Sequence, residues 1–136
     1  MHTIAYVSTA KLPFSEEALI QLLEKSRDNN KRFEITGMLL YKDGNFMQVI
    51  EGPKEAVTDL YRNICADPTH YNVLTLIDQV AEYRSFPDWQ MGFVNLSHST
   101  KEISGFSDFM LHSNKLQSYE QSHGKVLLFS FRDSFR

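Results

Sequence analysis

Cysteine is almost absent from this chain of 136 residues, because Cys65 is the only one. A single cysteine cannot form a disulfide within the chain, so a small fold held together by disulfides is excluded. Cys65 follows Ile64 inside a helical pattern of apolar residues, where a buried, inert thiol is the default. We therefore expect one cytoplasmic domain that is stabilised by its own hydrophobic core.

Excess positive charge and long apolar runs are missing as well. The chain has 14 Lys and Arg against 17 Asp and Glu, a formal net charge of −3, so it has no basic footprint for nucleic acid. No stretch approaches the roughly 20 apolar residues that span a bilayer. The first residues lack the basic and apolar regions of a secretion signal. We expect neither a nucleic-acid partner nor attachment to a membrane.

Motifs of the common enzyme classes are also missing. The chain has no Gly-x-Ser-x-Gly motif, and Cys65 has no adjacent histidine to activate it. The 5 histidines do not fall at metal-ligand spacing. An acyl phosphate hydrolase would need an anion-binding loop after the first strand, where this chain offers only Lys11 and no glycine. We therefore expect a protein that is not an enzyme and holds no metal.

The elements that are present follow the order strand, helix, strand, strand, helix, strand, with one further strand at the end. Alternating, β-branched and aromatic residues predict strands over residues 4–8, 33–41, 45–51, 72–83 and 89–96. Apolar spacing predicts a helix from the Ser15 cap to residues 28–30, and a second helix with Pro53 at its first position. An Asp-Gly turn joins the second and third strands. This order predicts an α+β, ferredoxin-like fold with two helices on one face of a mixed sheet.

The other face of the sheet also needs a cover, because both faces of the third strand carry large apolar residues. Residues 97–136 remain for this purpose. An amphipathic pattern there predicts a short helix with four apolar residues, Ile103, Phe106, Phe109 and Met110. We expect a ligand-binding domain over residues 1–96, and a C-terminal cap and output segment over residues 97–136 on the back of the sheet. Alternatively, the apolar residues 126–131 pair with a second subunit and make a homo-oligomer.

One amide stands among apolar neighbours in the third strand, Gln48 between Met47 and Val49. A buried amide without a hydrogen-bond partner costs about 1 to 3 kcal/mol, so a polar group is expected opposite it. Tyr6 in the first strand is a candidate, because alternation puts both side chains beneath the two helices. The phenol and the amide either complete an ordinary core or belong to a site.

Further polar side chains are expected near the same space. Asn29 and Asn30 come at the end of the first helix, where two amides could bind a ring edge that alternates carbonyl and N–H groups. A helix end that tolerates left-handed residues explains the two asparagines equally well. Asp67 and His70 follow the second helix and could approach the polar tail of a ligand, or could simply end the helix.

Together these segments resemble a BLUF domain of the short single-domain type, a flavin-binding sensor of blue light. The resemblance extends over about residues 1–96 and keeps the order and spacing of the family's motifs. It rests on Tyr6, Asn29-Asn30, residues 35–41 (ITGMLLY), 46–53 (FMQVIEGP), 67–70 (DPTH) and 86–91 (FPDWQM).

The resemblance implies a noncovalent flavin between the two helices, usually FAD, with FMN or riboflavin as alternatives. Leu22 and Ile64 would clamp the ring. Asn30 would hold its C4 carbonyl and N3 side, and Asn29 its C2 carbonyl. The remaining implied contacts come from Ser26, Phe46, Gln48, Asp67 and His70.

The resemblance also implies a mechanism. Light drives electron and proton transfer from Tyr6 to the flavin, and the bridging Gln48 amide then rotates or tautomerises and shifts the absorption to the red. Trp89 and Met91, which on their own are typical core residues, would pass this change to the C-terminal segment. The signal would reach a separate partner protein or change self-association. The alternative is a small-ligand or protein-interaction module of the same fold without photochemistry.

Two positions depart from the family's pattern near the phosphate end of the flavin. Asn63 and Thr69 stand where members often carry a basic side chain. This leaves the preference among FAD, FMN and riboflavin open. Lys31 and Arg32 are candidates to compensate, although a charge just after a helix is usually solvated.

Overall fold

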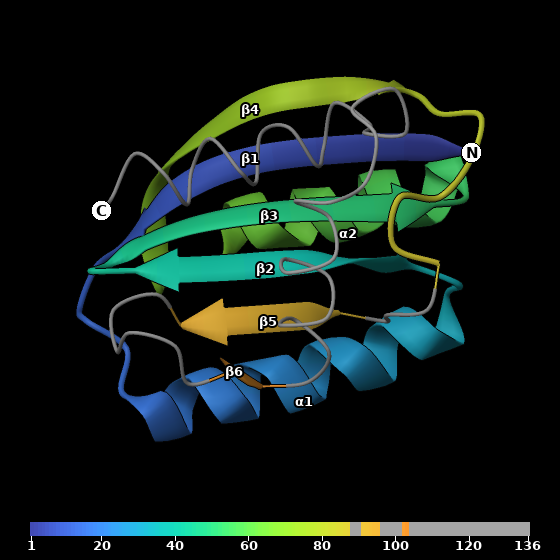
Figure 1. The fold of residues 1–136 in the computed structure, drawn as a ribbon. Helices are drawn as coiled ribbons and strands as arrows, with labels where there is room; N and C mark the ends of the chain where they lie inside the picture. Colours follow the sequence, from blue (N-terminus) through green and yellow to red (C-terminus); the bar gives the residue numbers. More distant parts are fainter. Residues whose placement is uncertain (88–90, 96–101, 104–136) are drawn as a thin grey trace, which may run out of the picture.

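The computed structural model of the chain describes residues 1–87, 91–95 and 102–103. Its elements are β1 (His2–Ala10), α1 (Glu16–Arg32), β2 (Thr36–Lys42), β3 (Asn45–Gly52), α2 (Lys54–Ala66), β4 (His70–Val80), β5 (Gly92–Asn95) and β6 (Glu102–Ile103). The strands form one sheet in the order β4-β1-β3-β2-β5-β6 (Figure 1). β5 pairs in parallel with β2 and the other pairs are antiparallel, so the sheet is mixed as predicted.

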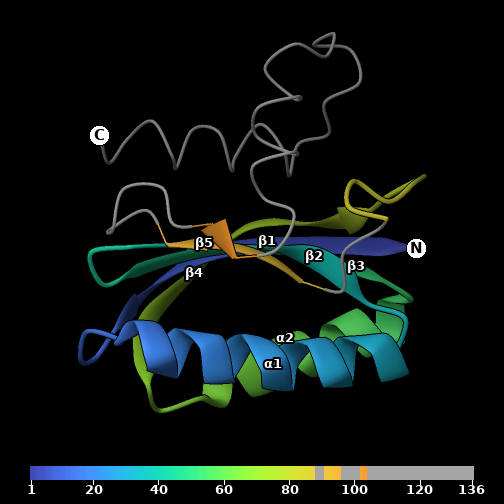
Figure 2. The same ribbon diagram turned by 60° about the horizontal axis from the view of Figure 1, so that its bottom comes forward.

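Both helices lie on the same face of the sheet, which confirms the ferredoxin-like fold (Figure 2). This follows from the two strand-helix-strand connections, each of which returns the chain across the same face. The core between the helices and the sheet includes Ile4, Leu19, Leu23, Leu39, Ile50 and Val57.

α1 ends later than predicted. It continues through Asn29 and Asn30 to Arg32, and the backbone N–H of Phe33 bonds to the carbonyl oxygens of both asparagines at 3.2 Å. Asparagine is a weak helix former, so the sequence favoured a stop at residues 28–30. The buried position of Asn30 shows that packing of the last turn outweighs this preference.

The hairpin of β2 and β3 turns at Asp43 and Gly44, as predicted. Their φ angles of 49° and 86° are both positive, as a two-residue hairpin turn of type I′ requires. β2 begins at Thr36 and not at residue 33, because Glu34 takes a φ of 58° and redirects the chain after the helix.

α2 begins at Lys54, so Pro53 occupies the N-cap and not the first helical position. Cys65 is exposed, which contradicts the expected buried thiol. It follows Ile64, which packs partly against the core. Cys65 is the next-to-last residue of α2, and Ala66 after it is exposed as well, so the end of the helix is not covered there.

The chain after β4 differs from the prediction in three places: residues 81–83 and Met91 are not in strands, and one residue of the expected helix lies in a strand. Ile103 lies in β6, paired with Phe93 of β5, and not in a helix. A strand of two residues has no periodicity that a sequence could reveal. The other expected positions of that helix, the apolar residues 126–131 and Trp89 lie outside the described residues.

A buried carboxylate fixes the connection from β4 to β5. Glu51 of β3 is fully buried and accepts hydrogen bonds from the backbone N–H groups of Ser85 (2.8 Å) and Phe86 (2.6 Å). The hydroxyl of Thr36 donates to it at 3.0 Å. Burial raises the pKa of the Glu51 carboxyl, although these hydrogen bonds and the charge of Arg84 act in the opposite direction. The chain therefore approaches β5 from an anchored point.

Candidate functional site

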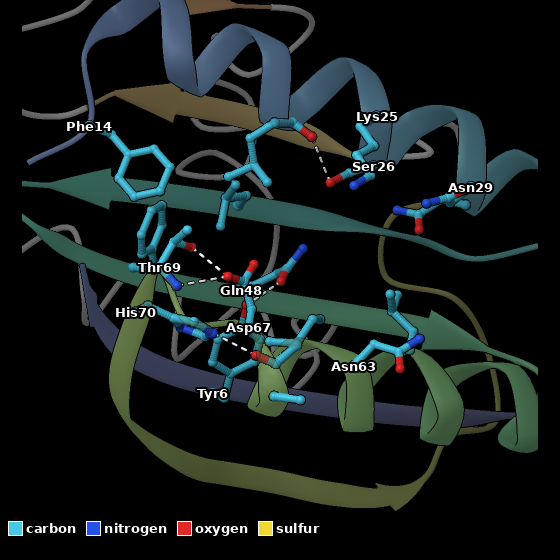
Figure 3. Close-up of a pocket in the computed structure, with 17 residues that line it drawn as sticks. Tyr6, Phe14, Lys25, Ser26, Asn29, Gln48, Asn63, Asp67, Thr69 and His70 are labelled. Carbon is cyan, nitrogen blue, oxygen red and sulfur yellow. Dashed lines mark hydrogen bonds between the residues drawn. The ribbon is translucent and has the colours of Figure 1, made fainter. Parts of the chain in front are cut away.

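A cavity of about 560 Å³ lies between the sheet and the two helices (Figure 3). Pockets for small ligands and cofactors have volumes of about 300 to 1,000 Å³. Its lining includes Tyr6 and every residue predicted to contact a cofactor, namely Leu22, Ser26, Asn29, Asn30, Phe46, Gln48, Ile64, Asp67 and His70. Met91 lies beside it in contact with Gln48.

α1 presents a mixed apolar and polar stripe to the cavity. Leu22, Lys25, Ser26 and Asn29 line it and recur at spacings of three and four residues, which places them on one face of the helix. The Ser26 hydroxyl donates to the Leu22 carbonyl at 2.8 Å. Asn30 is buried at the end of this stripe. Two amides and one ammonium group therefore face the cavity from the same helix.

The end of α2 contributes a carboxylate. Asp67 accepts hydrogen bonds from the N–H (2.8 Å) and the hydroxyl (2.7 Å) of Thr69. Partial burial acts to raise the pKa of Asp67, but these hydrogen bonds and the charges of His70 and Lys25 outweigh it and lower the pKa. Asp67 is consequently an anion at neutral pH.

Both ring nitrogens of His70 are engaged within the protein. Nε2 lies 2.6 Å from the Ile64 carbonyl oxygen, and Nδ1 lies 2.8 Å from the Ser8 hydroxyl. A carbonyl only accepts, so Nε2 carries the proton. A ligand in the cavity thus meets a ring held in a fixed position.

Tyr6 and Gln48 lie directly opposite each other in the paired strands β1 and β3. The Tyr6 hydroxyl donates to Gln48 Oε1 at 2.5 Å, and both side chains are buried. Burial raises the pKa of the Tyr6 phenol far above its usual range, and the nearby Tyr61, Cys65 and Asp67 raise it further. The phenol therefore keeps its proton. The polar group expected opposite Gln48 is present, as predicted.

The other end of the Gln48 amide contacts Met91. Gln48 Nε2 donates to the Met91 sulfur at 3.4 Å. The amide thus has a donor at its oxygen and an acceptor at its nitrogen, and one planar orientation satisfies both. Sequence reasoning placed Met91 on a transmission path but missed this contact, because it depends on the parallel pairing of β5 with β2.

Sequence reasoning also missed Lys25. Among the described residues that line the cavity, it alone carries a permanent positive charge. Lys31 and Arg32, the candidates taken from the sequence, are exposed in the last turn of α1 and do not line the cavity. The available signal was spacing, since Lys25 follows Leu22 by three residues and therefore shares its face of the helix.

The lining suits a flat ring with a polar edge. Asn29, Asn30 and Gln48 each offer an amide with both donor and acceptor, which matches an edge that alternates carbonyl and N–H groups. Leu22 on α1 and Ile64 on α2 supply apolar surface from the two helices. Fold and cavity together define a ferredoxin-like domain built to hold a heteroaromatic cofactor such as a flavin beneath its sheet.

Comparison with known proteins agrees with this class. The family model for BLUF, described as sensors of blue-light using FAD, matches residues 1–92. A photoactivated adenylate cyclase subunit beta of Euglena longa is 37% identical over 102 residues, which are 74% of this chain and 11% of that protein. The blue light- and temperature-regulated antirepressor BluF of Escherichia coli is 33% identical over 84 residues, which are 62% of this chain and 21% of that protein.

A solved structure shows the same fold. The dark-state structure of BlrB, a BLUF protein, superimposes with a TM-score of 0.66 at 38% identity, and the match covers 69% of this chain and 71% of BlrB. The chain belongs to the BLUF family of flavin-binding blue-light sensors, whose cofactor is FAD. It spans between about a tenth and a fifth of the length of the two curated relatives above.

In the described part of the chain, neither helix has the length and hydropathy of a membrane-spanning segment. No group of three or more His, Cys, Asp or Glu side chains in that part is arranged to hold a metal ion.

Proposed function

We propose that Tyr6 and Gln48 are the light-responsive pair of this sensor and that FAD occupies the cavity beside them. The observation that carries the proposal is the buried 2.5 Å hydrogen bond from the Tyr6 hydroxyl to Gln48 Oε1. Both side chains line the cavity, so a change at either one would reach a bound ring directly.

Asn29 and Asn30 would meet the polar edge of the ring, and Leu22 and Ile64 its faces. The two amides support this assignment because they belong to consecutive residues that both line the cavity. Ser26, Phe46, Asp67 and His70 complete the proposed contacts. Lys25 would attract the phosphates, which favours FAD and FMN over riboflavin.

When bound, FAD supplies the absorption of blue light and an excited state that accepts an electron. The chain contributes an oxidisable phenol and holds its proton on Tyr6 Oη, directed at Gln48 Oε1. The Gln48 amide has two planar orientations that exchange Oε1 and Nε2. The observed orientation suits both Tyr6 and Met91, so a change at Tyr6 alters the balance between the two orientations.

We further propose that the chain senses light without catalysing a reaction, and that its signal passes through residues 97–136 to a separate partner protein or to a second copy. Met91 supports this route because it contacts Gln48 and leads directly into β5. The cytoplasm is the proposed location. The scarcity of cysteine, with one Cys in 136 residues, supports a reducing compartment.

The test is the absorption spectrum of the purified protein before and after blue light. We expect a flavin band that shifts reversibly to the red. Tyr6→Phe and Gln48→Leu should keep the flavin and lose the shift, because each removes one side of the hydrogen bond. Tyr61→Phe is the matched control, since its ring centroid lies 5.5 Å from that of Tyr6 and its hydroxyl bonds to Thr75 instead.

Each outcome has a distinct meaning. A colourless protein that ignores added FAD would rule out the assignment of the cavity. A flavin band without a reversible shift would favour the small-ligand module over the sensor. Survival of the shift in Tyr6→Phe or Gln48→Leu would remove that residue from the mechanism.

A further inference from the structure

Met91 is held from two directions. Its sulfur accepts a hydrogen bond from Gln48 Nε2 at 3.4 Å, and its backbone carbonyl accepts one from Arg27 Nε at 3.0 Å. Met91 is 1% exposed, and the next residue begins β5. Arg27 therefore joins α1 to the residue that contacts the nitrogen end of the Gln48 amide.

The setting of Arg27 differs from that of an ordinary surface arginine. Its side chain is half-buried, and desolvation lowers the pKa of its guanidinium, with only partial compensation from Glu24. A hydrogen bond from a charged donor is stronger than one between neutral groups, and partial burial shields it from water. Arg27 is not among the residues that line the cavity, so the observed contact acts on the protein and not on a ligand.

The contact between the Met91 sulfur and Gln48 Nε2 requires that Met91 be held in place by other groups. A thioether is a weak acceptor on a side chain with three rotatable bonds, so it cannot fix its own position. On the β2 side, the methyl group of Met91 lies against Gly37, where an added Cβ would come within 3.2 Å of it. On the α1 side, Arg27 fixes the backbone from which the side chain extends.

We propose that Arg27 is a positioning residue for the photoresponse, which keeps the Met91 sulfur at the nitrogen end of the Gln48 amide. The inference rests on the proposed role of the Tyr6–Gln48 pair. Without Arg27, Met91 loses its anchor, and Gln48 loses the acceptor that distinguishes its two orientations. Coupling between sites is reciprocal, so a rearrangement of Gln48 also acts on α1 through Met91 and Arg27.

The experiment is a double-mutant cycle on the full chain loaded with FAD. Arg27→Met removes the donor, and Met91→Leu removes the sulfur but keeps the backbone carbonyl. Hydrogen bonds from charged donors have effects of about tenfold in an equilibrium or rate. We therefore expect Arg27→Met to change the rate of return to the dark spectrum by about tenfold, and to have less than about a twofold effect in the Met91→Leu background.

A second readout does not depend on light. Amide hydrogen exchange in β5 should become faster in Arg27→Met in the dark, since the start of the strand loses its link to α1. Arg32→Met is the matched control, because Arg32 is exposed on the same helix. Arg27→Gln retains a neutral donor and provides a milder variant if Arg27→Met does not fold.

Two results would overturn the inference. One is that Arg27→Met, or Arg27→Gln where Arg27→Met does not fold, behaves like Arg32→Met in both recovery rate and hydrogen exchange. The other is that the effect of Arg27→Met on recovery persists in full when Met91 is leucine, which would mean that it acts by another route. Failure of all variants and of the unmodified chain to bind flavin would instead contradict the proposed function.

Discussion

Lys25 gives the cavity one positive charge among amides, hydroxyls and apolar groups. It faces Asp67, whose pKa it helps to lower, so the two charges partly neutralise each other across the cavity. A phosphate is a stronger partner for an ammonium group than a carboxylate that already accepts two hydrogen bonds from Thr69. We therefore expect this single residue to favour phosphorylated flavins over riboflavin.

We predict that Lys25→Gln weakens binding of FAD and FMN and leaves riboflavin binding unchanged. An exposed charge pair contributes up to about 1 kcal/mol, so the Kd for the two phosphorylated flavins should rise up to about fivefold at low salt. Titration of the apoprotein with each flavin, followed by quenching of flavin fluorescence, measures the three constants.

Lys31→Gln serves as the control for loss of a lysine, because Lys31 is exposed on the same helix and does not line the cavity. Added salt should reduce the difference between Lys25→Gln and the unmodified chain, since exposed charges are screened. An equal change for all three flavins would show that Lys25 acts on the ring or on the fold, and not on the phosphates.

Among the elements, the connection between β4 and β5 depends on a single buried carboxylate. Glu51 receives hydrogen bonds from Ser85, Phe86 and Thr36, and the guanidinium of Arg84 donates to the Glu51 backbone carbonyl at 3.2 Å. Burial nevertheless raises the pKa of the Glu51 carboxyl above its ordinary value of 4.5. The anchoring of this connection is therefore sensitive to pH.

The pH dependence has a definite sign. Below the ordinary value of 4.5, the Glu51 carboxyl is protonated in both the folded and the unfolded chain. Between this value and the raised pKa, the folded chain holds the proton and the unfolded chain releases it, so the free energy of unfolding falls as pH rises. We predict that the free energy of unfolding of Glu51→Gln does not show this decline. Its stability relative to the unmodified chain should therefore rise as the pH increases from 4.5 to the raised pKa.

Urea denaturation at several pH values from 4.5 upward measures the effect. Glu82→Gln, an exposed residue in the same connection, is the control for the loss of one carboxylate. If the free energy of unfolding changes with pH in the same way for the unmodified chain and for Glu51→Gln, the prediction is wrong.

The sequence predicted the elements whose signals are local. The Asp43-Gly44 turn requires positive φ at both residues, and this chemistry is visible in two letters. Alternation along β1 and β3 was enough to place Tyr6 and Gln48 on one face. The end of α1 was missed because the packing of Asn30 is a tertiary effect, and β6 was missed because it has only two residues.

The residues of the candidate site also fall into two groups, those that the sequence could predict and those that it could not. Side chains that line the cavity were predictable where their type is unusual for their position, as with the amide of Gln48 in an apolar strand. Lys25 and Arg27 were missed because a charged residue on a helix is usually solvated. For Lys25 the only local signal was its spacing from Leu22, and Arg27 had no such signal. The link from Arg27 to Met91 joins residues 64 positions apart and depends on the position of β5 beside β2.

For the molecule as a whole, part of the apolar wall of the cavity is accessible to solvent. Leu22, Leu60 and Ile64 line it and are only half-buried. A ring that fills this space covers that surface in the folded state and has no equivalent site in the unfolded state. Cofactor binding and folding stability should therefore be linked.

We predict that FAD at about 100 times its Kd raises the free energy of unfolding by about 2.7 kcal/mol. Chemical denaturation in the dark, with and without FAD, measures the shift. Adenosine diphosphate carries the same diphosphate and adenosine but lacks the flavin ring, so it should stabilise the chain much less. Equal stabilisation by both compounds would show that the apolar walls of the cavity contribute little.

Cys65 is the only cysteine of the chain, and its thiol is exposed on α2 one residue beyond Ile64 of the cavity wall. A maleimide dye or a nitroxide spin label will therefore attach at one defined place on the unmodified protein. From that place it can report, in real time and without any substitution, whether the helix that bears it moves when the sensor is illuminated.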